Sequence, residues 1–200
     1  MDLKNKSIGK KLICLIISIK KKHYIIMASF HTKTFLKHDD YVSPESTWIN
    51  IKKFIKPYIS THLLYMPFYC EGSCGRDMRK LFPEAEVLHD EVDFFITKPE
   101  RPYIIVDNGP FSIKKQVIQE LAKRDVPFIL LMPSSTLNTN YIRENFKDKL
   151  QIIIPKRRIQ FTKKLEDGTP DPKWIGGRCN FEVFYFCYKM NLPRDIIFLD

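Results

Sequence analysis

The sequence predicts an α/β domain built on a mostly parallel sheet. Short apolar segments that suit buried strands alternate along the chain with longer segments that suit helices, which is typical of a parallel sheet with helical crossovers. In segment 113–121 the apolar residues recur at helical spacing, so that helix has one face to lay on the sheet. The 200 residues, 44% hydrophobic and 28% charged, suffice for one sizeable core.

The elements follow in order. We expect strands near 61–66, 86–89, 103–106, 127–132 and 150–154, and helices near 44–57, 75–82, 113–124 and 137–147. Ser43 and Pro44 suit the start of the first helix, because serine caps free amides and proline at the first helical position loses no hydrogen bond. The aromatic-rich segment 181–188 suits a long buried strand. Between Asp93 and Pro102 the chain has room only for a turn.

A polar turn ends the strand near 103–106, and its sequence is Asp107-Asn108-Gly109-Pro110-Phe111. The carboxamide of Asn108 and the carbonyl of Gly109 can accept hydrogen bonds from an exocyclic amine, and Phe111 can offer its ring to a flipped base. Asn-Gly between two apolar runs is also an ordinary tight-turn signal. The turn alone leaves both interpretations open.

Two further turns follow predicted strands. One contains Gly72 and Gly75, which would let backbone approach a ligand, although a plain strand-to-helix connection has the same composition. The other carries three carboxylates and two aromatics in segment 90–95. A solvated acidic loop is the alternative for that second turn, because Asp and Glu mostly lie on surfaces.

Taken in order, these segments resemble the motifs of class I N6-adenine methyltransferases of the phage and large DNA virus type, which use S-adenosyl-L-methionine. Segment 107–111 resembles their Asn-Pro-Pro-Phe signature, and segment 67–75 resembles their Pro-Phe and glycine-rich loop. Residues 41–44, Tyr-Val-Ser-Pro, resemble their Tyr-x-Thr-Pro motif, although helix capping explains this segment equally well. Segments 127–133 and 154–161 extend the resemblance, which covers roughly Asp39 to Leu199.

The resemblance implies a Rossmann-like class I methyltransferase sheet, mostly parallel with an antiparallel last strand and with helices on both faces. It implies methyl transfer to the N6 amine of adenine in nucleic acid, with DNA favoured. The implied catalytic residues are Asn108, Gly109, Pro110 and Phe111, and the implied cofactor-binding residues are Tyr41, Pro67, Phe68, Gly72, Gly75, Asp90, Glu91, Asp93 and Phe94. Among these, Asp90 or Glu91 would accept hydrogen bonds from ribose hydroxyls, and Asp93 with Phe94 would lie against the cofactor's adenine.

Three residues depart from the family pattern. Met66 stands where an acid usually meets the cofactor's ammonium, Cys70 replaces a usual glycine, and Gly109 replaces the first proline of the signature. These departures favour an alternative, which is a catalytically inactive methyltransferase-like protein that binds nucleic acid, or a subunit that activates a partner enzyme. No segment looks like an inserted target-recognition domain, so a partner subunit could supply target recognition, and DNA, RNA and a smaller adenine-containing substrate all stay open.

Basic residues cluster near the carboxyl end of the chain, at Lys156, Arg157, Arg158, Lys163 and Lys164. Such a cluster can hold a phosphate backbone, although a solvated face also explains a run of charge. The formal net charge of +10 belongs largely to residues 1–26, which hold seven lysines and one aspartate. The rest of the chain is only mildly basic.

Residues 1–26 differ from the rest, so we divide the chain into a basic extension, 1–26, and a single methyltransferase-like domain, 27–200. The apolar run 12–19 is too short to span a bilayer, and three lysines rather than a cleavage site follow it. The five cysteines show no paired spacing, so we expect no metal site and a cytoplasmic location, in the host cytoplasm for a viral protein.

Met27-Ala-Ser begins a plausible protein of its own. We therefore predict that translation starts at Met27, or that residues 1–26 are translated as a disordered arm. Under the first hypothesis, mass spectrometry of the protein from its natural source should find an amino-terminal peptide that begins at residue 27 or 28. Peptides covering Lys4 to Lys11 would contradict the internal start.

Overall fold

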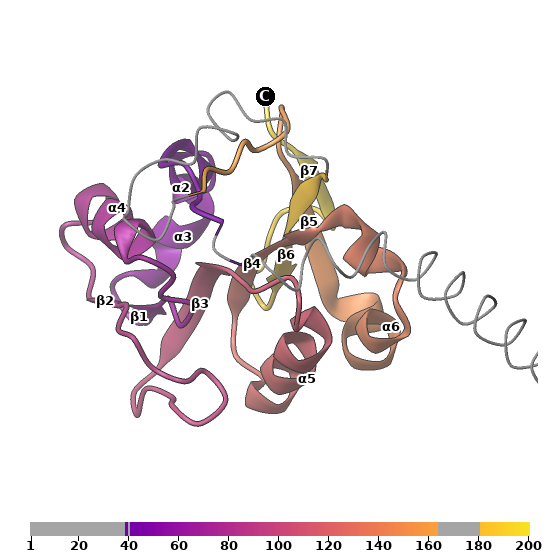
Figure 1. Ribbon diagram of the computed structural model, residues 1–200, viewed down its shortest axis with the longest axis horizontal. Coiled ribbons are helices and arrows are strands. Elements are labelled where there is room, and N and C mark those ends of the chain that lie inside the picture. Colours follow the sequence, from indigo (N-terminus) through magenta and orange to yellow (C-terminus); the bar gives the residue numbers. More distant parts are fainter. Residues whose placement is uncertain (1–38, 40, 164–180) are drawn as a thin grey trace, which may run out of the picture. The chain divides into compact units, whose positions relative to one another are not determined.

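The computed structural model describes residues 39, 41–163 and 181–200. The predicted extension 1–26, Cys14, Lys164 and Cys179 lie outside the described residues. A seven-stranded sheet forms the centre of the domain (Figure 1), in the order β2-β1-β3-β4-β6-β5-β7. Its strands are β1 (Leu63–Tyr65), β2 (Val87–Leu88), β3 (Tyr103–Asn108), β4 (Phe128–Pro133), β5 (Leu150–Ile154), β6 (Val183–Tyr188) and β7 (Ile196–Phe198).

The strand directions confirm the predicted Rossmann-like fold class. Strands β2, β1, β3 and β4 pair in parallel, and β5 pairs in parallel with β7. Strand β6, predicted as the antiparallel strand, lies between β4 and β5 and runs opposite to both. It is not the last strand, because the short edge strand β7 follows it. Three residues at a sheet edge give too short a pattern to predict.

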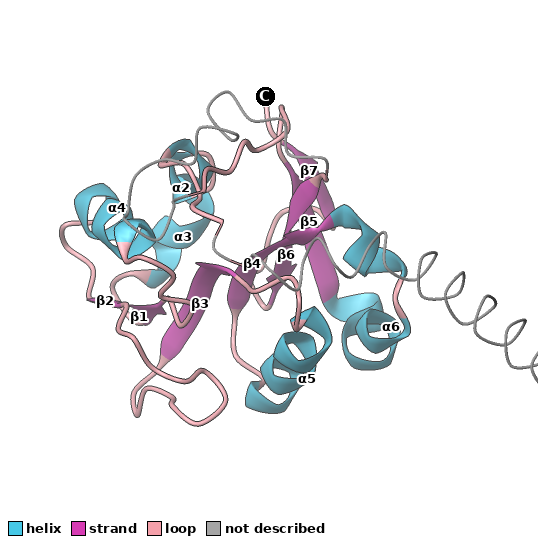
Figure 2. Ribbon diagram, viewed as in Figure 1, coloured by secondary structure: helices cyan, strands magenta, loops and turns pink. Residues whose placement is uncertain are grey.

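Helices cover both faces of the sheet (Figure 2), with α2, α3 and α4 on one side and α5 and α6 on the other. They are α2 (Ser46–Ile49), α3 (Lys52–Ile55), the 3₁₀ helix η1 (Lys56–Tyr58), α4 (Ser73–Leu81), α5 (Lys114–Arg124), η2 (Ser134–Asn138), α6 (Asn140–Phe146) and η3 (Lys147–Lys149). Because both faces are covered, every residue of β4 is buried, as in parallel sheets generally.

The single helix predicted near 44–57 was wrong, because this segment forms α2, α3 and η1 in succession. Ile51 leaves the helical region between α2 and α3, with φ −109° and ψ 4°. Pro57 has no N–H to donate into an α-helix, so the last turn tightens to a 3₁₀ helix. The Ser43 hydroxyl is buried without a hydrogen-bond partner in the described part of the chain, so it does not provide the predicted cap.

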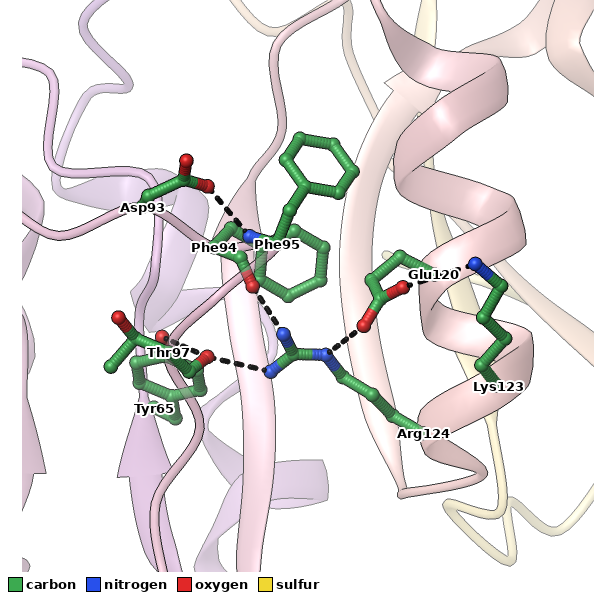
Figure 3. Close-up of polar contacts among 8 residues, drawn as sticks. All are labelled: Tyr65, Asp93, Phe94, Phe95, Thr97, Glu120, Lys123 and Arg124. Atoms are coloured by element: carbon green, nitrogen blue, oxygen red, sulfur yellow. Dashed lines mark hydrogen bonds and ion pairs between the residues drawn. The ribbon is translucent and has the colours of Figure 1, made fainter.

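The connection from β2 to β3 contains no helix or strand between residues 89 and 102, as the sequence predicts. Arg124, at the end of α5, forms hydrogen bonds to the backbone of this loop (Figure 3). Its guanidinium donates to the carbonyl oxygens of Phe94 and Thr97 and to the Glu120 carboxylate. The guanidinium carbon also lies 4.2 Å from the centroid of the Phe94 ring. Only 6% of the Arg124 side chain is exposed, so one buried cation orders a loop that has no secondary structure of its own.

No helix in residues 41–163 or 181–200 combines the length and the apolar character that crossing a bilayer requires.

Replacing Arg124 with methionine should lower the free energy of unfolding by about 3 kcal/mol, because the loop carbonyls and Glu120 lose a charged donor in a buried setting. The matched control is Lys123→Met, since the Lys123 side chain is 75% exposed and its loss should change stability by less than about 0.5 kcal/mol. Urea denaturation of both variants measures the difference. Equal stabilities for the two variants would contradict the role of Arg124.

Candidate functional site

The candidate site lies where the chain reverses its direction of travel across the sheet. Strand β1 leads to β2 on one side, whereas β3 leads to β4 on the other, and β1 and β3 are neighbours. In open α/β sheets, ligands bind outside the carboxyl ends of the strands at such a switch point. The chain segments at the carboxyl ends of β1 and β3 meet at this edge, and they hold the four predicted catalytic residues and the predicted cofactor-binding residues Pro67, Phe68, Gly72 and Gly75.

Asp107 joins these two segments. Its carboxylate accepts hydrogen bonds from the backbone N–H of Phe68, at 2.7 Å, and of Asn108, at 2.8 Å. The side chain is buried, and burial raises the pKa of Asp107 well above its ordinary value despite the two N–H donors, which lower it. Asp107 was not among the predicted site residues, although an acid at the end of an apolar strand is a signal that the sequence contains.

Asn108 carries a buried acceptor that has no hydrogen-bond partner among the described residues. Its Nδ2 donates to the carbonyl oxygen of Tyr41 at 3.2 Å, which fixes the orientation of the amide. Its Oδ1 is buried and has no hydrogen-bond partner among the described residues. A buried acceptor without a partner is costly to the folded state, so the position fits a donor that arrives with a ligand.

Gly109 packs directly against the segment after β1. A Cβ atom at this position would lie 3.2 Å from the Met132 methyl and 3.5 Å from Cε2 of Phe68. Proline, which stands here in the resembled signature, would therefore press on Met132. Glycine therefore suits the packing of this turn, and its carbonyl group remains as an acceptor.

Phe111 lies inside an aromatic cluster. Its side chain is only 1% exposed and stacks on Tyr41, with the ring centroids 5.9 Å apart and the planes inclined by 27°. The rings of Phe161 and Phe181 meet it edge-on. A base could lie on Phe111 only after Tyr41 moves. Tyr41 thus lies beside both Asn108 and Phe111.

The segment after β1 is shaped by two glycines. Gly72 precedes α4 with φ +79°, a conformation that favours glycine. Gly75 lies within α4 against His89, because a Cβ at Gly75 would come within 2.3 Å of the imidazole. His89 is bonded through Nδ1 to the carbonyl oxygen of Met66 at 2.7 Å, and its burial lowers its pKa.

The acidic turn after β2 divides into exposed and buried parts. Asp90, Glu91 and Asp93 are exposed, and Asp93 accepts a hydrogen bond from the N–H of Phe95 at 2.8 Å. Phe94 is buried. Its ring centroid lies 5.0 Å from that of Phe68, and the ring also contacts the Arg124 guanidinium. The structure thus leaves the carboxylates accessible and covers the Phe94 ring.

The residues present fit the ribose of the implied cofactor better than its ammonium group. Asp90 and Glu91 are exposed carboxylates that could accept hydrogen bonds from ribose hydroxyls. At the ammonium end, Met66 is completely buried and supplies no charge. The acid of the glycine-containing turn is Glu71, which pairs with Arg76 at 3.5 Å. Pro67 is buried beside these residues, and Pro110 is partly buried after Gly109.

The four described residues of the predicted basic cluster differ in exposure. Lys156, Arg157 and Arg158 are exposed after β5, and Arg158 pairs with Glu182 at 3.0 Å. Lys163 is only 7% exposed, and its ammonium lies 5.2 Å from the centroid of the Tyr41 ring. Among the described residues, no group of three or more His, Cys, Asp or Glu side chains could hold a metal ion.

Comparison with known proteins adds little to this geometry. No family model matches the chain, and no curated protein matches it. Among solved structures, it is similar to the crystal structure of the 23S rRNA methyltransferase ErmE, with 10% sequence identity, a TM-score of 0.33, and coverage of 70% of this chain and 68% of that one. The fold assignment therefore rests on strand order and direction.

Replacing Asp107 with asparagine should lower the free energy of unfolding by about 1–3 kcal/mol, because an amide nitrogen cannot accept one of the two N–H bonds. The loss should be largest near pH 4 and should shrink as the pH rises. The reason is that the raised pKa lets the folded wild type keep a proton that the unfolded chain releases above its ordinary pKa of about 3.9.

Urea denaturation of the two proteins from about pH 4 upward tests this dependence. Parallel stability curves would show that Asp107 titrates alike in the folded and unfolded chains, contrary to the prediction.

Proposed function

We propose that this chain transfers a methyl group from S-adenosyl-L-methionine to the N6 amine of adenine in nucleic acid, with DNA favoured. The observation that carries the proposal is the buried Oδ1 atom of Asn108, which has no partner within the described residues and lies at the switch point of the sheet. An exocyclic amine is the donor that this acceptor and the neighbouring carbonyl of Gly109 would suit. The resemblance to phage and large-virus enzymes favours DNA.

The residues that would hold the adenine contribute mainly by positioning its amine. Oδ1 of Asn108 and the carbonyl oxygen of Gly109 would accept hydrogen bonds from the amine and keep its lone pair aimed at the reacting methyl group. The bond from Nδ2 to Tyr41 ensures that the oxygen rather than the nitrogen of the amide meets the amine. Such orientation supplies a large part of the rate enhancement in group transfer, and a general base is not needed to begin a direct displacement.

Other residues would hold the cofactor, which supplies an electrophilic methyl group when bound. We assign its ribose hydroxyls to Asp90 and Glu91, and its methionine end to the turn that contains Gly72. Asp93 and Phe94 are assigned to its adenine, although Phe94 must leave Arg124 and Phe68 to present its face. Lys156 and Arg157 are exposed beyond the carboxyl end of β5, at the same sheet edge, where they would contact phosphates.

The alternative function is a methyltransferase-like protein that binds nucleic acid without catalysis, or that activates a partner enzyme. The buried Met66 side chain and the Tyr41 ring stacked on Phe111 favour it. Calorimetric titration of the full chain with S-adenosyl-L-methionine, and then with its demethylated product, separates the two functions. Micromolar binding is expected for the enzyme, whereas undetectable binding would favour the alternative.

Replacing Asn108 with alanine should reduce methyl transfer by at least about 100-fold, because one oriented acceptor is lost. Stability should fall by only about 1 kcal/mol, since among the described residues the side chain loses one hydrogen bond, to the carbonyl oxygen of Tyr41. Transfer of a radioactive methyl group to adenine-containing DNA and RNA measures the activity. The matched control is Gln116→Ala, which removes an exposed amide from α5 and should leave the rate unchanged. Activity retained by Asn108→Ala would refute the role given to this amide.

A further inference from the structure

A groove is lined by residues of α2 and α3 and by the end of β7, and none of the proposed catalytic residues lines it; Figure 1 shows where these elements lie. It encloses about 480 Å³, and its lining includes Ile49, Lys52, Lys53, Lys56, Phe198 and Asp200. This volume is in the range that accepts a small ligand or one unit of a polymer.

One wall of this groove is basic. Lys52, Lys53 and Lys56 lie within five residues of each other and are all exposed. None of the three forms a salt bridge with another described residue. The one acid in the lining is Asp200, so the groove carries a net positive charge that suits an anionic occupant.

The other wall presents an aromatic ring on a rigid support. Phe198 is 72% exposed, which is unusual for so large an apolar side chain. Its backbone is fixed, because β7 pairs with β5 in register at Ile154 and Phe198. The N–H of Leu199 also donates to the carbonyl oxygen of Ile154 at 3.0 Å. Ile49, 50% exposed, continues the apolar surface across the groove.

A basic wall facing an exposed aromatic ring is the arrangement that binds single-stranded nucleic acid, since lysines follow the phosphates and a base stacks on the ring. Bases within a duplex are already stacked and could not use Phe198. Ile154, which pairs with Phe198, is followed closely in the chain by the exposed residues Lys156 and Arg157.

We propose that this groove binds a single-stranded segment of nucleic acid, with its phosphates on Lys52, Lys53 and Lys56 and one base on Phe198. The assignment rests on the proposed function in giving the groove and the candidate site the same substrate. It concerns binding, so it is measured without cofactor or methyl transfer.

Fluorescence anisotropy of the full chain with a labelled single-stranded oligonucleotide tests the charge contribution. The triple variant Lys52→Gln, Lys53→Gln and Lys56→Gln should bind at least tenfold more weakly at low salt. The slope of log K against log salt concentration should fall by about 2, since each phosphate contact on a single strand contributes about 0.7. The control variant Lys115→Gln, Lys123→Gln and Lys147→Gln removes the same charge from exposed positions on the α5 and α6 side. Equal losses in the two triple variants would overturn the proposal.

Phe198→Ala tests the stacking contribution separately. It should weaken binding by about tenfold, as expected for one base on an aromatic ring. With an oligonucleotide that is abasic throughout, Phe198→Ala and the wild type should bind alike. An equal loss on both oligonucleotides, stronger binding of a duplex than of the single strand, or binding of anionic lipid vesicles in place of the oligonucleotide would overturn the proposal.

These results are distinguishable from failure of the proposed function. All four substituted side chains are exposed, so circular dichroism should show the variants folded as the wild type is. A chain that binds the single strand through this groove but does not bind S-adenosyl-L-methionine would keep the groove assignment and lose the enzymatic one. If the chain methylates adenine while the groove variants bind the single strand as the wild type does, the enzymatic assignment is kept and the groove assignment is lost.

Discussion

The hydrogen bond between the Asp107 carboxylate and the Phe68 N–H, 2.7 Å long, is the contact on which the candidate site depends. Pairing of β1 with β3 ends at Tyr65 and Ile105, so beyond that point no ladder bond holds the two strands together. Asp107 continues the connection with a side chain. It thereby sets the position of the turn after β1 relative to Asn108 and Gly109, and it does so from a buried position where the geometry has little freedom to change.

The sequence predicted the sheet well because its central strands are continuous apolar runs. Strands β3 and β4 and helix α5 form close to the expected residues, since burial on both faces leaves a pattern that depends little on distant residues. The break between α2 and α3 was missed because Trp48, Ile51 and Ile55, all completely buried, keep an apolar spacing close to that of one helix. Strand β7 was missed because Ile196 and Phe198 are exposed, which a buried-strand pattern does not capture.

The sequence indicated which chemical groups lie at the candidate site, but it did not indicate which of their side chains are buried. Residue types identified Asn108 and the acids after β2, because amides and carboxylates are recognisable at the ends of strands. The sequence could not show that Tyr41 would cover Phe111 or that Lys163 would lie over the Tyr41 ring. Phe111 is 70 positions from Tyr41 in the chain, and Lys163 is 122 positions from it. The basic groove escaped notice for the same reason, since its two walls come from opposite ends of the domain.

The stacking of Tyr41 on Phe111 would affect the affinity for any base that binds on the Phe111 ring. A base can reach the Phe111 ring only in molecules where Tyr41 has moved aside, so the measured dissociation constant for a base equals the intrinsic one divided by the fraction of open molecules. Opening comes before any contact with the base, and every candidate base meets the same penalty. Under the proposed function, Tyr41 would therefore lower affinity without improving discrimination, and selection of adenine would depend on the acceptors of Asn108 and Gly109.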